Sequence, residues 1–306
     1  MSENAFEEKL LRMVVLAGPN GSGKSTVTDA LKIDEKFPDV YINADDISRT
    51  ELAHISDPIK RNIEAANLAE RRRRDALMSG KPFAFETVMS TPGKLALFDE
   101  ARTKGYNVDL IFVTTEDVAI NLIRVENRVA KGGHSVDPGK IAERYERAMH
   151  LLPSAIAKSD MAEIYDNSFT GHRPILVARK YNHQIEFIDS QPKWVQECLV
   201  EPIQQRCASR EKLSAELLSL YPNAQIKDAD IGHGKCYSGL IVGMTDLHIL
   251  QRISGVDDSF VLHDKILCAP MAYKTGKAMA ISYAFGADGK HKMLMKRQSQ
   301  ARSREH

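Results

Sequence analysis

One short segment of the chain combines residue types that bind phosphate. Residues 18–25 read GPNGSGKS and match the pattern G-x-x-x-x-G-K-[ST] at every fixed position. The glycines let consecutive backbone N–H groups curl around an anion, and the N-terminus of a following helix adds partial positive charge. Lys24 would reach the outer phosphates of a nucleoside triphosphate, and the Ser25 hydroxyl would bind Mg²⁺. We expect a P-loop for ATP and Mg²⁺ formed by Gly18, Pro19, Asn20, Gly21, Ser22, Gly23, Lys24, Ser25 and Thr26.

A P-loop alone does not distinguish a kinase from a GTPase or a motor ATPase. The sequence lacks a long apolar strand that ends in Asp-Glu, the usual metal-and-base pair of ATPases. It also lacks the N-K-x-D segment that reads guanine. These two absences favour a small-molecule kinase of the nucleotide-kinase type.

Carboxylates follow two of the expected strands. The second strand ends in Asn43-Ala44-Asp45-Asp46, and the third ends in Glu86-Thr87. Ligands of open α/β folds bind at the carboxyl edge of the strands. An acid there can accept the proton of an attacking hydroxyl, so we expect one of Asp45 and Asp46 to be catalytic and the other to cap the next helix. Glu86 could bind an acceptor hydroxyl or a water on Mg²⁺, with a solvated loop carboxylate as the alternative.

Arginines lie on two consecutive predicted helices that a glycine pair separates. Arg124 and Arg128 are four residues apart and share one helical face, and Arg144 and Arg147 follow on the next helix. Arginines on a mobile lid can stabilise the charge that spreads over a transferring phosphoryl group, and Gly132-Gly133 suits a hinge. The alternative is a solvated basic helix paired with neighbouring glutamates. We favour that alternative for Arg147 and a functional role for Arg128 and Arg144.

The expected elements place these residues in an α/β fold. Short apolar runs alternate with helical segments, which predicts βαβ units and a parallel sheet with helices on both faces. In the helix expected at 58–78, Ile59, Ile63, Ala66 and Leu68 are assigned to the apolar side, and Arg71 to Arg74 to a mostly solvated face. Strands are expected at 13–17, 40–43, 83–85, 108–113, 163–165 and 175–178, and helices at 23–31, 58–78, 93–104, 118–130 and 141–152.

The pattern changes after residue 190. A helical stretch over 192–220 is followed by glycine-punctuated strands at 236–242, 246–252, 259–263 and 278–284, and then by a charged end with few apolar residues. We therefore predict four parts: a kinase domain at 1–190, a helical connector at 191–222, a small β-rich domain at 223–290 and a basic disordered tail at 291–306.

Composition and charge exclude several classes of protein. Hydrophobic content is 43%, charged content is 27% and the net charge is +1, as in ordinary soluble proteins. The sequence lacks an apolar run of membrane-spanning length, and its N-terminus is too acidic for a signal peptide. The four cysteines show neither zinc spacing nor a disulfide framework. A cytoplasmic location without membrane contact is expected.

The ordered set of segments resembles the zeta-toxin family of P-loop kinases. GPNGSGKS at 18–25, NADDI at 43–47, FETVMS at 85–90 and RVAKGGHSVDPGKIAERY at 128–145 follow that family's order, over about residues 12–185. The resemblance implies that Lys24 and Ser25 bind ATP and Mg²⁺. It implies Asp45 rather than Asp46 as the base, because the family places the acid two residues after the position of Asn43. It also implies acceptor binding for Glu86, and catalysis from a lid that clamps the γ-phosphate for Arg128 and Arg144. In addition, we expect Asp46 and Thr87 to bind the acceptor and Arg124 to bind the nucleotide.

The resemblance also implies an acceptor and a biological role. The acceptor class would be UDP-activated amino sugars such as UDP-N-acetylglucosamine, phosphorylated on a sugar hydroxyl. Growth inhibition and an antitoxin partner would be consequences. A weaker similarity to the KfrB-type domain of plasmid-associated proteins covers about 235–283, where KCYSGLIVGMTDLHILQRI and FVLHDK carry it.

Two other hypotheses stay open. The first is a nucleotide-gated DNA-binding or plasmid-maintenance protein; the near-neutral net charge argues against it, and the basic tail argues mildly for it. The second is a C-terminal domain that covers the kinase cleft and inhibits it. The acceptor itself, whether nucleotide sugar, nucleoside or nucleic acid, is not determined by the sequence.

Overall fold

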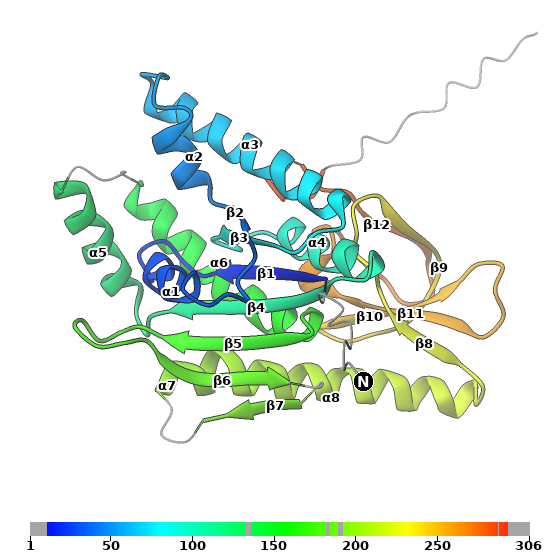
Figure 1. Ribbon diagram of the computed structural model, residues 1–306. Coiled ribbons are helices and arrows are strands. Elements are labelled where there is room, and N and C mark those ends of the chain that lie inside the picture. Colours follow the sequence, from blue (N-terminus) through cyan, green and yellow to red (C-terminus); the bar gives the residue numbers. More distant parts are fainter. Residues whose placement is uncertain (1–10, 132–135, 182–183, 189–191, 287, 293–306) are drawn as a thin grey trace, which may run out of the picture.

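The computed structural model describes residues 11–131, 136–181, 184–188, 192–286 and 288–292. Two sheets lie side by side along the long direction of the molecule (Figure 1). The larger sheet has seven strands in the order β2-β3-β1-β4-β5-β6-β7. The strands from β2 to β5 in this order run parallel to one another, whereas β6 pairs antiparallel with β5, and β7 pairs antiparallel with β6. This arrangement confirms the predicted α/β class.

The central strands of this sheet are buried on both faces. Along β1, Val14 and Leu16 pack on the side of α1, and the alternate residues Met13 and Val15 pack into the larger core on the other side. A strand buried on both faces needs a continuous apolar run, which explains the sequence MVVLA. The elements of this part are β1 (Arg12–Ala17), α1 (Lys24–Leu31), β2 (Val40–Ile42), α2 (Ala44–Thr50), α3 (Pro58–Ser79), β3 (Phe83–Thr87), α4 (Gly93–Thr103), β4 (Asn107–Thr114), α5 (Val118–Ala130), α6 (Pro138–Lys158), β5 (Met161–Asp166), β6 (Ile175–Tyr181) and β7 (Gln184–Phe187).

Helix α3 shows how local signals set an element's ends. The Asp57 side chain accepts hydrogen bonds from the first turn, Pro58 occupies the first helical position, and Gly80 ends the helix with φ 64°. The predicted apolar side of α3 is wrong for Ile59, Ile63 and Ala66, which are exposed, whereas Leu68 packs against the core as predicted. Ile59 and Ile63 are 73% and 56% exposed, because the N-terminal half of α3 extends beyond the sheet with α2 (Figure 1).

The arginine run on α3 is mostly solvent-exposed, as expected, and Arg73 is its buried member. Arg73 is buried, binds Glu70 at 2.6 Å and lies with its guanidinium carbon 5.3 Å from the centroid of the Phe85 ring. Arg72 forms a bidentate pair with Glu51, with both N···O distances at 2.6 Å. Glu70 also binds the Lys94 ammonium, and together the cations lower its pKa to about 2 although burial opposes that shift.

The C-terminal part forms a five-stranded sheet in the order β12-β9-β10-β11-β8. The sequence predicts four of its strands, and β8 was not expected because QIKD has one apolar residue. The short β7 and α2 were likewise not predicted as elements. This part comprises α7 (Lys193–Val195), a π-helical turn (Gln196–Val200), α8 (Glu201–Leu220), β8 (Gln225–Asp228), β9 (Lys235–Met244), β10 (His248–Ile253), β11 (Ser259–Asp264), a short 3-10 turn (Lys265–Leu267) and β12 (Ala278–Tyr283).

The two parts share one hydrophobic core and are joined by buried polar contacts. Asp99 of α4 accepts hydrogen bonds from the Lys158 ammonium of α6 at 2.6 Å and from the Ile231 N–H at 2.8 Å. Asp264 of β11 accepts from Ser154 of α6 and Arg206 of α8. Asp99 is buried and Asp264 is half-buried, and carboxylates that bind several donors define one relative arrangement of the elements that supply those donors.

The C-terminal sheet lies at the end of the molecule away from α1 (Figure 1). Lys158, which takes part in the contact to the C-terminal part, comes just before β5, and the first residues of β5 pair with the start of β4. The P-loop, in contrast, follows the carboxyl end of β1, at the opposite edge of the sheet. Within the described residues, no hydrogen bond or ion pair joins 223–292 to residues 18–26. The arrangement thus argues against a C-terminal domain that covers the P-loop. The predicted tail from 293 onward lies outside the described residues.

None of the helices in the described ranges is long and apolar enough to cross a membrane.

We predict that Asp99→Asn lowers the free energy of unfolding by about 3 kcal/mol, because it leaves the Lys158 ammonium without its charged partner. Urea denaturation followed by far-UV circular dichroism measures the effect. Glu186→Gln is the control, because it breaks the exposed pair with Arg179 and should cost less than about 1 kcal/mol. Equal losses in the two variants would contradict the role of Asp99.

Candidate functional site

Close packing around the P-loop permits only glycine at positions 18 and 23. A Cβ on Gly18 would lie 2.0 Å from the carbonyl oxygen of Val113, and one on Gly23 would lie 2.1 Å from Nδ2 of Asn167. Both glycines have positive φ, 143° and 91°. Neighbouring backbone segments therefore press against the loop from β4 and from the turn after β5, and the loop conformation is set by its surroundings as well as by its sequence.

Two asparagines that the sequence did not single out hold the loop in place. Asn121 of α5 donates to the carbonyl of Asn20 at 2.7 Å, and Asn167 donates to the carbonyl of Ser22 at 2.8 Å. Neither asparagine belongs to a motif; Asn121 lies in α5, and Asn167 lies in the turn that leads from β5 toward β6. The Oγ of Ser22 and the Oδ1 of Asn20 are buried without a hydrogen-bond partner in the described part of the chain.

Lys24 is buried at the centre of the site. Its ammonium donates to the carbonyls of Gly18 and Pro19, each at 2.9 Å, and lies 4.0 Å from Oε1 of Glu86. Burial lowers the pKa of Lys24, and the carboxylates of Glu86 and Asp45 oppose that shift. The predicted phosphate-binding lysine and both predicted acids thus act on one another. Ser25 and Thr26 are exposed in the first turn of α1.

Glu86 is oriented by donors from the neighbouring strand. Its Oε2 accepts from the Tyr41 hydroxyl at 2.7 Å and from Nδ2 of Asn43 at 3.0 Å. Both bonds end on one oxygen, which leaves Oε1 toward Lys24. Burial raises the pKa of Tyr41, and Glu86 raises it further. The Lys32 ammonium lies 4.0 Å from the centroid of the Tyr41 ring. The sequence did not identify Tyr41, which becomes relevant only because β2 pairs with β3.

The two adjacent aspartates have different surroundings. Asn43 caps α2, because its side-chain oxygen accepts from the Asp45 N–H at 2.8 Å. The expectation that one aspartate caps this helix is therefore wrong. Asp46 is half-buried and pairs with Arg49 on the surface of α2. Asp45 is exposed, and within the described residues its side chain has no hydrogen bond or ion pair, although its charge acts on Lys24.

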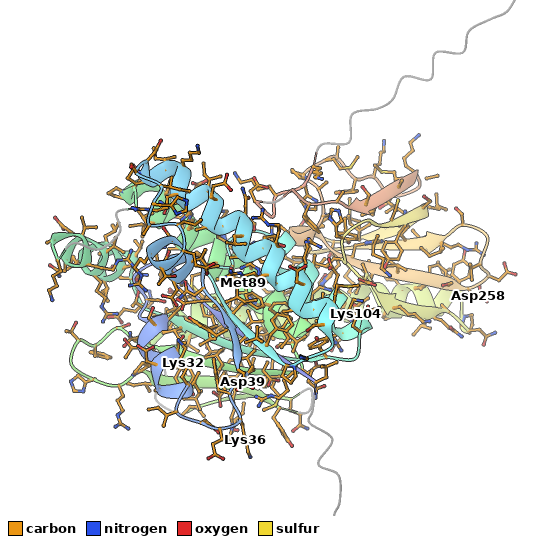
Figure 2. The ribbon with its side chains drawn as sticks, turned by 45° about the horizontal axis from the view of Figure 1, so that its top comes forward. Lys32, Lys36, Asp39, Met89, Lys104 and Asp258 are labelled. Atoms are coloured by element: carbon orange, nitrogen blue, oxygen red, sulfur yellow. The ribbon has the colours of Figure 1, made fainter. Side chains whose placement is uncertain are left out.

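Thr87 has a structural part in the site. Its carbonyl accepts from the Gly18 N–H at 3.2 Å, and its hydroxyl accepts from the Met89 N–H at 3.2 Å. Met89 is buried and has φ 54°, a left-handed conformation that a non-glycine residue adopts only when its surroundings require it. Figure 2 shows Met89 beneath α3, in the middle of the molecule. The turn after β3 is thereby fastened to the P-loop.

The four predicted lid arginines are distributed differently. Arg124 donates to the carbonyls of Asn167 and Ser168, at 2.7 and 3.4 Å. The Arg128 charge lowers the pKa of Lys24 further, so it acts on the same site. Arg144 is half-buried on α6, and Arg147 pairs with Glu143, in line with the solvated-helix interpretation preferred for it. The glycines at 132 and 133 lie outside the described residues.

The arrangement combines an anion cradle with carboxylates on one side and a cation on the other. Glu86 lies near the end of β3, Asp45 lies in the first turn of α2 after the adjacent strand β2, and Arg128 lies on α5. Such a site can hold a polyphosphate in the loop and a polar second molecule against the acids. The carboxyl edge of a parallel sheet is the expected position for it.

Comparisons with known proteins match both parts of the chain. The family model described as zeta toxin matches residues 5–170, and the model described as KfrB domain matches residues 236–293. An uncharacterized protein of Haemophilus influenzae is 26% identical over 134 residues, which cover 44% of this chain and 92% of that protein.

Solved structures show a similar fold. The complex AvrRxo1-ORF1:AvrRxo1-ORF2 with sulphate ions matches with a TM-score of 0.50 at 14% identity, over 62% of this chain and 63% of that chain. The match therefore spans less than two thirds of that protein. The PezAT chromosomal toxin-antitoxin system of Streptococcus pneumoniae matches with a TM-score of 0.44 at 16% identity, over 68% of this chain and 90% of that chain. Because the zeta toxin model covers more than half of the 306 residues, the chain, with its P-loop kinase fold, belongs to the zeta toxin family.

Proposed function

We propose that the protein transfers the γ-phosphoryl group of ATP to a hydroxyl of a small acceptor, most specifically a UDP-activated amino sugar such as UDP-N-acetylglucosamine. One observation carries the proposal: the buried Lys24 ammonium binds the P-loop carbonyls and lies 4.0 Å from Oε1 of Glu86, and the Asp45 carboxylate raises its pKa. A cation next to a phosphate cradle and to carboxylates suits phosphoryl transfer to a hydroxyl, because the cation stabilises the phosphates and an acid can accept the hydroxyl proton.

The residues present suit ATP and Mg²⁺. The cradle contains glycines whose Cβ atoms would clash with neighbouring backbone, and it contains two buried polar atoms, of Asn20 and Ser22, without protein partners in the described residues. The Ser22 hydroxyl can donate a hydrogen bond to a phosphate oxygen, whereas the amide oxygen of Asn20 can only accept one. The exposed Ser25 hydroxyl and the nearby carboxylates are oxygen donors of the type Mg²⁺ prefers. When bound, Mg²⁺ supplies charge neutralisation to the outer phosphates.

The proposed mechanism assigns a role to each side chain. Lys24 exchanges its bonds to the P-loop carbonyls for bonds to the β- and γ-phosphates. Asp45 accepts the proton of the acceptor hydroxyl while the hydroxyl oxygen forms a bond to the γ-phosphorus. The bond between the γ-phosphorus and the oxygen that bridges it to the β-phosphate breaks, and ADP is released. Glu86 binds the acceptor through Oε1. Arg128 and Arg144 stabilise the charge on the transferring group.

Membership of the zeta toxin family supports a further part of the proposal. We propose that the transfer inhibits growth and that an antitoxin protein restrains it. Growth of cells that express the chain, compared with cells that express Lys24→Ala, tests this part: equal growth would argue against a toxin.

A screen of acceptors tests the proposed reaction most directly. Nucleotide sugars, nucleosides and oligonucleotides are incubated with radiolabelled ATP and the protein, and products are identified by mass spectrometry. Transfer to UDP-N-acetylglucosamine is expected. Transfer to an oligonucleotide alone, or salt-dependent binding of duplex DNA without transfer, would favour the alternative of a plasmid-maintenance protein, to which the KfrB domain match is relevant.

We predict that Gly23→Ala weakens ATP binding by at least about tenfold, because a Cβ at this position displaces the side-chain amide of Asn167. A tenfold change corresponds to about 1.4 kcal/mol of binding free energy. Calorimetric titration with an ATP analogue measures the affinity. Gly80→Ala is the matched control, because Gly80 also has positive φ but has open space around its Cβ position. It should lose about 1 kcal/mol of stability and keep its affinity for ATP. Equal affinities in both variants would refute the steric argument.

We predict that Asp45→Asn reduces turnover by roughly 10²- to 10⁴-fold while ATP affinity is retained, as expected for loss of a general base. ADP release with the acceptor present measures turnover. Asp46→Asn, at the adjacent carboxylate that pairs with Arg49, should change turnover little. Full turnover in Asp45→Asn together with loss in Asp46→Asn would transfer the role to Asp46.

We predict that Tyr41→Phe raises the KM for the acceptor by roughly tenfold, because Glu86 loses one of the two donors that orient it. Initial rates at varied acceptor concentration give this value. Tyr165→Phe is the matched control: its hydroxyl binds Glu163 at 2.9 Å, outside the cluster around Lys24. A raised acceptor KM in both variants would indicate a general packing effect.

A further inference from the structure

The chain has one tryptophan, and it is fastened to the nucleotide side of the sheet. Trp194 of α7 is 5% exposed, and its Nε1–H donates to Oδ2 of Asp166 at 2.8 Å. Asp166 is the last residue of β5 and is 2% exposed. A buried carboxylate without its donor loses stabilisation that water cannot replace, so this bond constrains both residues.

The other oxygen of Asp166 organises the turn that follows β5. Oδ1 accepts from the N–H of Ser168 at 2.7 Å, and it also contacts the Ser168 hydroxyl. That hydroxyl in turn accepts from the Glu116 N–H at 2.8 Å. Asp166 thus joins α7, through Trp194, to a turn held against the end of β4.

The same turn holds the P-loop. Asn167, between Asp166 and Ser168, donates to the Ser22 carbonyl at 2.8 Å, and its Nδ2 occupies the space beside Gly23. Arg124 donates to the carbonyls of Asn167 and Ser168 from the outer side. Three consecutive residues therefore connect Trp194, the predicted nucleotide-binding arginine and the phosphate cradle.

The helix that begins with Trp194 leads to the C-terminal sheet. Residues 193–220 form α7, a π-helical turn and α8. Their combined length is roughly 40 Å at 1.5 Å per residue. Figure 1 shows α8 passing beneath the seven-stranded sheet toward β8 and β11. At that end Arg206 binds Asp264 at 2.6 Å, and Ser209 binds His248 at 2.7 Å. One continuous helical segment thus contacts, at its start, the turn at 166–168 that holds the P-loop, and it contacts the C-terminal sheet along its length.

We propose that Trp194 is a positioning residue for nucleotide binding and that the connector 193–220 couples the C-terminal sheet to the P-loop through the Trp194–Asp166 bond. The inference rests on the proposal that the P-loop binds ATP, but it does not depend on the acceptor. A ligand that moves the connector changes nucleotide affinity, and by linkage the nucleotide changes that ligand's affinity by the same factor.

Calorimetric titration with a non-hydrolysable ATP analogue and Mg²⁺ tests the inference on the full chain. Trp194→Phe keeps a buried ring and removes the donor, and it should weaken binding roughly five- to thirtyfold. Tyr106→Phe is the matched control. It also removes a donor from a buried ring, one that binds the Lys81 carbonyl at 3.1 Å at the other edge of the sheet. It should lower the unfolding temperature with unchanged affinity.

A variant at the far end tests the coupling itself. Arg206→Met breaks the pair with Asp264 and should weaken binding roughly two- to fivefold, less than Trp194→Phe. In the unmutated chain, tryptophan emission should change on saturation with the analogue, because the only indole of the sequence is bonded to the P-loop turn. This measurement requires no variant to fold.

The outcomes separate the inference from the proposed function. Unchanged affinity in Trp194→Phe, or an emission spectrum that the analogue leaves unaltered, would overturn the positioning role while nucleotide binding stands. Unchanged affinity in Arg206→Met would overturn the coupling to the C-terminal sheet. Failure of the unmutated chain to bind the analogue would overturn the proposed function and, with it, the inference.

Discussion

The burial of one ammonium group constrains the organisation of the whole site. Lys24 is removed from water, and its charged form is stable there only because oxygen atoms surround it: two P-loop carbonyls and, further out, the carboxylates of Glu86 and Asp45. The P-loop carbonyls, Glu86 and Asp45 come from three different parts of the chain. The strands that carry them must therefore end at the same edge of the sheet, close to the start of α1.

The strand order meets this requirement. β3 lies between β2 and β1, so Leu16 is paired with Glu86 and Ile42 with Phe85. Tyr41 and Asn43 thereby reach Glu86, and Glu86 reaches Lys24. In a parallel sheet, the carboxyl ends of the strands lie at the same edge. The strand order therefore brings the carboxylates to the P-loop. The hydrogen bonds from Tyr41 and Asn43 both end on Oε2 of Glu86, so Oε1 is the oxygen that faces Lys24.

Residues outside the motifs hold the P-loop at this edge of the sheet. Asn121 and Asn167 hold the P-loop, and Arg124 fixes the turn that carries Asn167. The C-terminal sheet packs at the opposite end, where Asp99 and Asp264 collect donors from several elements. Buried polar groups with several partners specify one arrangement of elements more strictly than apolar contact does, because a displaced partner leaves an unpaired group in a low-dielectric interior.

The sequence by itself determined the P-loop, the alternation of strands and helices and the positions of Asp45 and Glu86 at strand ends, because these depend on local spacing and on the period of apolar residues. It could not determine which face of α3 is buried, since Ile59 and Ile63 extend beyond the sheet while Arg73 packs on Phe85 with Glu70 as its partner. Nor could it identify Tyr41, Asn167 or Trp194, whose roles come from contacts between residues far apart in the chain. Asn43 rather than an aspartate caps α2, a choice that depends on how the chain leaves β2. Local pattern sets what each segment is, and only the packing of distant segments decides which polar groups meet.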